Sequence, residues 1–270
     1  MITINNNMYV LDTDNTSYAF AVLGSGQLEH LYYGRKLHAN EAVMTEKHTF
    51  IPGNTNVYNK DYSSYSLEDV CLEMSSLGKG DIREPFIEVT YPNGSSTTDM
   101  VFDRAEIIQG KEEYDTLPGS YDDNGEVEQL VIYLKDRNYN LTLELHYYVY
   151  EKCDIITRSA KLVNSGNESV RLERLMSMQL DLNESDYELS FFNGAWAREM
   201  NRSRIPIRAG KYVNESVTGT SSNRANPFFM IGRSSTTEDY GECYGFNLIY
   251  SGNHYEAAQV NSYGKLRLVS

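Results

Sequence analysis

Apolar and polar side chains alternate through residues 141–150, and this alternation restricts the segment to an extended strand. Successive side chains of a strand point to opposite faces of a sheet, so residues of one parity share a face. The apolar parity holds Leu141, Leu143, Leu145, Tyr147 and Val149, whereas the other parity is polar or aromatic. The pattern predicts an antiparallel strand that is buried on one face.

The same period of two recurs along most of the chain. It runs through 170–182, where Arg174 interrupts the apolar face and predicts a β-bulge or a buried ion pair. Turns rich in Gly, Asn and Asp separate the strands. A sustained helical period is missing, and 41–47 and 66–77 are the only candidates for short helices. Further strands are predicted at 8–12, 17–23, 28–33, 85–91, 127–134, 155–163, 187–193, 228–232 and 243–250.

These elements predict the fold class, which is all-β. The number of strands exceeds that of an immunoglobulin-type domain, so we expect a large antiparallel β-sandwich. All-β chains of 270 residues often form one domain, and no shift in composition marks a linker. We therefore predict a single domain over residues 1–270.

The charge balance restricts the partners. The chain has 24 Lys and Arg against 38 Asp and Glu, a formal net charge of −14. Such a surface repels phosphate backbones and anionic membranes, so neither nucleic acid nor a membrane is an expected partner. No signal peptide and no apolar stretch of about 18 residues is visible. We expect a cytoplasmic protein, for which neutral ligands such as sugars remain open.

The residues that could hold a metal or form disulfides are scattered. Cys71, Cys153 and Cys243 are far apart and odd in number, which predicts reduced thiols within the core. The five His form no metal-ligand pair such as His-x-x-x-His. The sequence therefore predicts neither a metal site nor a cofactor.

Catalytic residues are not obvious. Glycoside hydrolysis needs two carboxyl groups about 5 to 9 Å apart, and sequence spacing in a sheet does not fix that distance. His146 on the polar face of its strand is either a general base or an interstrand hydrogen-bonding residue, and His254 is expected in a turn. Trp196, the single tryptophan, either stacks on a sugar ring or packs in a core or interface.

Seven runs in a fixed order resemble a known family. They resemble the N-terminal β-supersandwich domain of glycoside hydrolase family 36 α-galactosidases, a domain of galactose-mutarotase-like topology. The resemblance covers nearly the whole chain. The runs are GDIREPFIEV (80–89), LPGSY (117–121), HYYVYEKCDIITRSAKLVNSG (146–166), LERLMSMQLDL (172–182), GAWARE (194–199), SSNRANPF (221–228) and GECYGFNLIYSGNH (241–254).

The resemblance implies a retaining hydrolase that removes terminal α-linked galactose. In this family two Asp residues act on a (β/α)₈ barrel that follows the N-terminal domain, at the C-terminal ends of its strands. The chain then looks like a piece that ends before the barrel, so the family match assigns no catalytic residue here. The implied partners are galactosides, the enzyme's own barrel and neighbouring subunits of a homo-oligomer, without a metal or cofactor.

The resemblance also implies loop contacts near the active site of a neighbouring subunit. The matching loop here spans about 48–66, and its candidate residues for the rim are Phe50, Asn54, Asn56, Tyr58 and Tyr65. The family often has an Asp-Phe-Arg-x-Pro run next, and Ile82-Arg83-Glu84-Pro85 stands in its place. We expect Arg83 to be structural and to pair with a carboxylate across strands.

Two other functions remain open. An enzyme of the aldose-mutarotase type would use His146 and Glu144, which share a strand face, as its base and acid. A lectin-like sugar-binding module would use Trp196 and the many tyrosines.

Overall fold

The computed structural model describes residues 1–38, 56–63 and 66–270. The chain falls into two compact units, and each is described by itself. Unit 1 comprises residues 1–113 and 120–181, and unit 2 comprises residues 114–119 and 182–270. Within the described ranges, no helix is long and apolar enough to span a bilayer.

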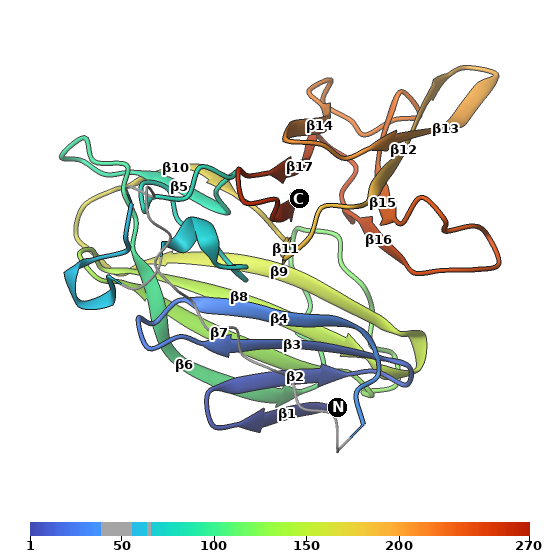
Figure 1. Ribbon diagram of the computed structural model, residues 1–270. Helices are drawn as coiled ribbons and strands as arrows, with labels where there is room; N and C mark the ends of the chain where they lie inside the picture. The colour runs from blue at the N-terminus through green and yellow to red at the C-terminus, as the bar shows by residue number, and fades with distance from the viewer. Residues whose placement is uncertain (39–55, 64–65) are drawn as a thin grey trace. The chain divides into compact units, whose positions relative to one another are not determined.

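Unit 1 is built on two four-stranded antiparallel sheets that lie face to face (Figure 1). Phe20 of one sheet stacks on Tyr147 of the other, with ring centroids 5.4 Å apart. The first sheet contains, in order, β1 (Ile2–Asn5), β2 (Met8–Asp12), β3 (Thr16–Val22) and β4 (Leu28–Arg35). The second contains β6 (Met100–Gln109), β7 (Glu128–Asp136), β8 (Leu141–Tyr150) and β9 (Ile155–Asn164).

A strand pair and short 3₁₀ turns complete unit 1. β5 (Ile87–Thr90) pairs with β10 (Arg171–Leu175), and the register shifts between Leu172 and Arg174. The predicted bulge is therefore present. Arg174 also forms an ion pair with Glu84, but its side chain is 31% exposed, so this pair is only partly buried. The 3₁₀ turns are η1 (Lys60–Tyr62), η2 (Leu67–Asp69) and η3 (Glu151–Cys153), and β11 (Gln179–Leu182) leads into unit 2.

A buried carboxylate connects the two sheets of unit 1. The Glu73 side chain is 0% exposed. It accepts hydrogen bonds from the hydroxyl of Tyr18 on β3 (2.7 and 2.8 Å) and from that of Tyr147 on β8 (2.8 Å). Arg158 of β9 pairs with Glu73 at 2.8 Å, and His30 Nδ1 of β4 lies 3.3 Å from it. One side chain thus holds residues from both sheets.

Arg158 completes this network with its remaining donors. It donates to the Tyr18 hydroxyl (3.1 Å), the Tyr147 hydroxyl (3.2 Å) and the Gln179 carbonyl (2.7 Å). Burial works to raise the pKa of Glu73, but Arg158 and His30 oppose it, and the net pKa lies below the ordinary value. Glu73 is therefore ionised in the folded protein at neutral pH.

A second buried ion pair confirms the structural role predicted for Arg83. Its guanidinium lies 3.1 Å from Asp181 and 2.9 Å from Asp81, and its side chain is 0% exposed. It also donates to the carbonyl of Val70 at 2.8 Å. Asp181 in turn accepts the backbone N–H of Leu72. Arg83 therefore fixes the segment that carries Glu73.

Unit 2 contains two smaller antiparallel arrangements. The first is a sheet of four strands in the order β13 (Arg198–Pro206), β12 (Glu188–Ala195), β15 (Ala225–Gly232) and β16 (Cys243–Asn247). In the second, β17 (His254–Val260) lies between β14 (Gly210–Ser216) and β18 (Leu266–Val269). Phe229 and Phe246 stack across β15 and β16 with ring centroids 4.8 Å apart.

The all-β prediction is confirmed, with corrections in detail. The predicted strands at 8–12 and 141–150 have the bounds of β2 and β8. The predicted helix at 66–77 is wrong beyond one 3₁₀ turn, and the one at 41–47 lies outside the described residues. All three cysteines are thiols outside any disulfide, as predicted, but Cys153 and Cys243 are exposed rather than in the core.

Replacing the buried Glu73 with Gln should destabilise unit 1 strongly. The change leaves the Arg158 charge buried without its counter-charge, which typically costs about 3–5 kcal/mol. Urea unfolding measures this loss. The matched control is Glu106→Gln, because Glu106 pairs with Arg104 at an exposed position and should change the unfolding free energy by less than about 1 kcal/mol. Equal losses in the two variants would contradict the role of Glu73.

The same carboxylate should contribute to acid sensitivity. Its pKa is lower in the folded than in the unfolded chain, so its stabilisation is present above the ordinary value of 4.5 and is lost as the pH falls through the folded pKa. Unfolding free energies measured at successive pH values below 4.5 should therefore fall more steeply in the wild type than in Glu73→Gln. Parallel pH profiles would refute this assignment.

Candidate functional site: the Trp196 hairpin

Strands β12 and β13 of unit 2 form a tight hairpin. Asn193 pairs with Asn201 and Ala195 with Arg198, so Trp196 and Ala197 form a two-residue turn. The register shifts between Asn193 and Ala195, at Gly194. A bulge beside a turn re-aims the side chains at the hairpin's end.

The backbone of the hairpin is in a costly conformation. Ala197 has φ 61° and Met200 has φ 57°, and residues other than Gly seldom adopt these values. Each such residue costs about 1–3 kcal/mol, and such strain clusters at functional sites. Two of them within four residues indicate that the shape of this hairpin is maintained by its surroundings.

Trp196 is 90% exposed at this turn. A buried Trp ring removes about 200 Å² of mostly apolar area from water, which corresponds to about 5 kcal/mol. The exposed ring of Trp196 therefore does not contribute this stabilisation to the described structure. Core packing of Trp196 within the described structure is therefore wrong, and an interface or a ligand contact remains.

Local hydrogen bonds hold the hairpin in place. The Glu199 carboxylate accepts the backbone N–H of Ala197 at 2.9 Å, and the Asn201 amide donates to the Arg198 carbonyl at 2.7 Å. The Asn226 amide lies 3.4 Å from the sulfur of Met200. These contacts leave the indole ring itself uncovered.

The rim residues predicted in the loop 48–66 have different outcomes. Phe50, Asn54 and Tyr65 lie outside the described residues. Asn56 is exposed, beside Gly80. Tyr58 is only 6% exposed, and its hydroxyl donates to Asp99 at 2.9 Å, so its ring packs in the core of unit 1 rather than at a rim.

Tyr58 instead anchors the end of that loop. Its ring packs with Leu67, Val70 and Leu72, and Lys79 lies 5.0 Å from the ring centroid. Burial raises the pKa of the Tyr58 hydroxyl, so it stays protonated and donates to Asp99. Sequence alone could not separate this packing role from a sugar contact, because tyrosine suits both.

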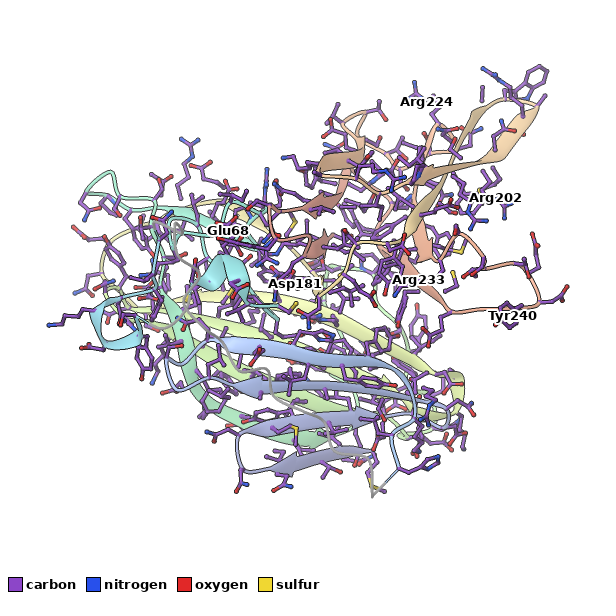
Figure 2. All side chains as sticks on the ribbon, viewed as in Figure 1. Glu68, Asp181, Arg202, Arg224, Arg233 and Tyr240 are labelled. Atoms are coloured by element: carbon purple, nitrogen blue, oxygen red, sulfur yellow. The ribbon has the colours of Figure 1, made fainter. Side chains whose placement is uncertain are left out.

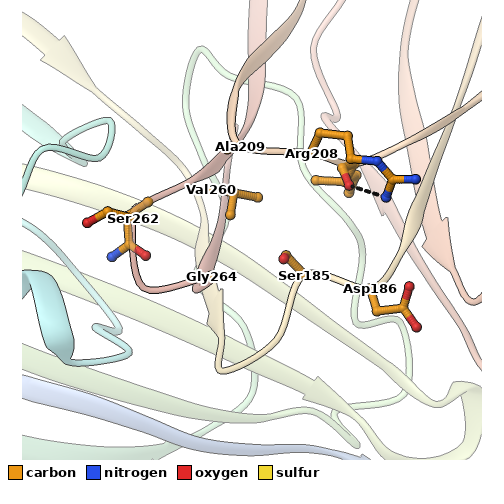
Figure 3. Close-up of a pocket in the computed structure, with 9 residues that line it drawn as sticks. Ser185, Asp186, Arg208, Ala209, Val260, Ser262 and Gly264 are labelled. Carbon is orange, nitrogen blue, oxygen red and sulfur yellow. Dashed lines mark hydrogen bonds between the residues drawn. The ribbon is translucent and has the colours of Figure 1, made fainter.

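A cavity of ≈ 380 Å³ in unit 2 is lined by Asp186, Arg208 and Asn261, among others (Figure 3). The Arg208 guanidinium donates to the Ile207 carbonyl at 3.3 Å. Asp186 is the one acidic residue among the described residues lining it. The cavity therefore lacks the carboxyl pair that glycoside hydrolysis needs.

A second cavity of ≈ 290 Å³ in unit 2 contains two carboxylates, and each faces an arginine. Glu188 pairs with Arg204, and Glu238 lies 3.6 Å from Arg202, which is labelled in Figure 2. Each carboxylate of this cavity therefore already has an arginine as its partner. Across the described ranges, no cluster of His, Cys, Asp and Glu could hold a metal ion.

His146 has the structural role of an interstrand histidine. Its Nδ1 lies 2.8 Å from the Gln129 amide on β7, and its Nε2 lies 3.4 Å from Glu144. Burial lowers the pKa of His146, although Glu144 opposes this effect. The residue is 7% exposed and lines neither of the two cavities described above.

The two units differ in charge. Unit 1 has 15 Lys and Arg against 28 Asp and Glu, whereas unit 2 has 9 against 10. The net negative charge of the chain is thus concentrated in unit 1. The hairpin belongs to a nearly neutral unit, which suits contact with an uncharged ligand.

The described residues thus form an all-β fold with one exposed tryptophan on a strained hairpin. A family model for the glycosyl hydrolase family 36 N-terminal domain matches residues 26–270. The chain belongs to this family.

Individual relatives agree with this assignment. The chain is 34% identical over 264 residues to alpha-galactosidase AgaA of Geobacillus stearothermophilus, covering 96% of this chain and 35% of AgaA. It is 33% identical over 266 residues to the bifunctional alpha-galactosidase/sucrose kinase AgaSK of Mediterraneibacter gnavus, covering 98% of this chain and 28% of AgaSK. The chain therefore spans about a third of the length of these relatives.

Solved structures show the same fold. The GH36 alpha-galactosidase AgaB from Geobacillus stearothermophilus superposes with a TM-score of 0.94 at 31% identity, covering 100% of this chain and 37% of AgaB. The alpha-galactosidase from Lactobacillus brevis superposes with a TM-score of 0.92 at 35% identity, covering 98% of this chain and 36% of that protein. A variant of AgaA has been solved in complex with raffinose.

Replacing Gly194 with Ala should displace the Trp196 turn. The new Cβ would lie 2.3 Å from the backbone oxygen of Arg198, which cannot rotate away. We expect a loss of about 1–3 kcal/mol in the free energy of unfolding. The indole N–H of the single tryptophan should also shift in ¹H–¹⁵N NMR spectra.

Gly245→Ala is the matched control for this change. Gly245 lies on β16 of the same sheet, and its Cβ would meet Phe228 at an ordinary 3.5 Å. The indole signal should stay in place in this variant. An unchanged indole signal in Gly194→Ala would contradict the close approach in the hairpin.

Proposed function

We propose that this chain serves as the N-terminal domain of an α-galactosidase that hydrolyses terminal α-linked galactose from oligosaccharides. The family match and the curated relatives support the parent activity. The single observation that carries a role for this domain is the 90% exposed Trp196 on a strained hairpin.

The chemistry of the ring favours a sugar. The C–H face of a galactose ring is flat and apolar, and an indole face matches it without requiring a charge. Arg198 and Glu199 follow the ring in sequence, and both are exposed. Their polar groups can reach sugar hydroxyls while the indole covers the apolar face. Complexes of AgaA variants with raffinose and stachyose suggest galactosides of this class as the substrate.

Catalysis itself is assigned to a part of the enzyme outside this chain. The chain spans about a third of its relatives, and the carboxylates of its second cavity are held by arginines. The domain would pack against a catalytic barrel and support a homo-oligomer, in which Trp196 reaches the rim of a neighbouring subunit's active site. Asn56, an exposed residue of the loop 48–66, remains a second candidate for that rim. Hydrolysis by two carboxyl groups needs no cofactor.

The 270-residue chain by itself should not hydrolyse an α-galactoside with a chromogenic leaving group. The assay compares the purified chain with buffer and with the variant His146→Ala. Release of the chromophore by the chain above the buffer background would refute the proposal. An enzyme of the aldose-mutarotase type would instead interconvert the anomers of free galactose, and full anomerase activity in His146→Ala would end that alternative.

A lectin-like module is the second candidate, because an exposed Trp could bind sugar without a catalytic domain. Calorimetry of the chain with galactose, melibiose and raffinose separates the two functions. Our proposal predicts no saturable heat, since one ring without a surrounding pocket buries too little of a sugar. Saturable heat that disappears in Trp196→Ala would favour the lectin.

A further inference from the structure

His254 is buried at the start of β17, not in a turn as its sequence context predicted. Its side chain is 0% exposed, and both ring nitrogens face oxygens. Nδ1 lies 2.9 Å from the Glu256 carboxylate, and Nε2 lies 3.0 Å from the Ala225 carbonyl. A carbonyl only accepts hydrogen bonds, so Nε2 carries a proton and donates it.

Glu256 connects this histidine to a third residue. The Asn214 amide donates to Glu256 at 2.7 Å and to the Asn226 carbonyl at 2.8 Å. Asn214 and Glu256 are directly opposite on β14 and β17, so the pairing of the strands fixes their separation. The cluster of His254, Glu256 and Asn214 thus holds two successive carbonyls, at Ala225 and Asn226.

Those two carbonyls belong to the first residues of β15, which adjoin the Trp196 hairpin. Ala225 pairs with Asn193, the residue that precedes Gly194. The Asn226 side chain lies against Met200, one of the two residues of the hairpin with positive φ. A chain of direct contacts therefore runs from Glu256 to both strands of the hairpin.

The free energy needed to bury this cluster indicates that its role is not packing alone. Burying a carboxylate and an imidazole is expensive, and a well-packed apolar pair would often be as stable. Burial raises the pKa of Glu256, and His254 and Asn214 counter this effect. Directional hydrogen bonds to two carbonyls fix a backbone position in a way that apolar contacts do not.

We propose that the cluster of His254, Glu256 and Asn214 is a positioning device that holds the strained Trp196 hairpin in its sugar-facing conformation. The relevance of this cluster to sugar recognition rests on the proposed function of the hairpin. The positioning of the hairpin by the cluster does not depend on that function. The cluster acts on the hairpin through the carbonyls of Ala225 and Asn226. The three residues are positioning residues that do not touch the sugar.

Amide hydrogen exchange of the 270-residue chain tests this proposal without any sugar. Glu256→Ala removes the acceptor for both His254 and Asn214, so exchange in residues 193–201 should become at least about tenfold faster through local opening. Glu256→Gln should keep exchange close to the wild type. Its amide can donate to Nδ1 of a neutral His254 while its oxygen still accepts from Asn214.

Val260→Ala is the matched control, because Val260 is buried on the same strand but lies at the opposite end of β17 from His254, where it pairs with Gly210. It should lower the melting temperature without changing exchange in 193–201. Unchanged exchange in a folded Glu256→Ala, or equal acceleration in Val260→Ala, would overturn the proposal. An unchanged KM for raffinose in a Trp196→Ala variant of the enzyme that contains this domain would affect the proposed function alone.

Discussion

The interaction on which unit 1 depends most is the ionised carboxylate of Glu73 in its apolar interior. Such a group is tolerated only when its charge and its lone pairs are satisfied. Arg158 supplies the opposite charge, and Tyr18 and Tyr147 supply hydroxyl donors from opposite sheets. Because the donors belong to different sheets, the carboxylate specifies how the two sheets face each other as well as stabilising them.

The same logic extends to the segment that carries Glu73. Arg83 and Asp181 hold the backbone near Leu72, and the Glu73 N–H donates to the Leu28 carbonyl on β4. Unit 2 uses a smaller version of this device, in which His254 and Glu256 hold backbone carbonyls next to a hairpin. In both units, buried polar and ionisable side chains fix backbone positions that apolar packing alone would leave less well defined.

Strands were predictable from sequence where one face is buried. The regular alternation in β8 gave its bounds. β6 lacks a continuous alternation because a bulge between Phe102 and Arg104 shifts its parity. β13 is exposed along most of its length, so burial imposes no pattern on residues such as Arg198 and Arg202. Period-based reasoning fails at both, since it detects burial rather than strand geometry.

The candidate site was predictable only in part. The sequence identified Trp196 but could not show its exposure, because an indole suits a core as well as a sugar. The positive φ at Ala197 and Met200 has no signal in residue type, since neither is Gly or Asn. His254 followed a turn-like Ser-Gly-Asn run, and its burial depends on pairing with β14, which sequence spacing does not reveal.

The central claim is that this domain contributes Trp196 to sugar recognition in an α-galactosidase. The most direct measurement is steady-state kinetics of the α-galactosidase that contains this domain, with raffinose as the substrate, for the wild type and Trp196→Ala. Loss of a stacking contact of about 1.4 kcal/mol should raise KM about tenfold and leave kcat nearly unchanged. An unchanged KM in a correctly assembled enzyme would contradict the account.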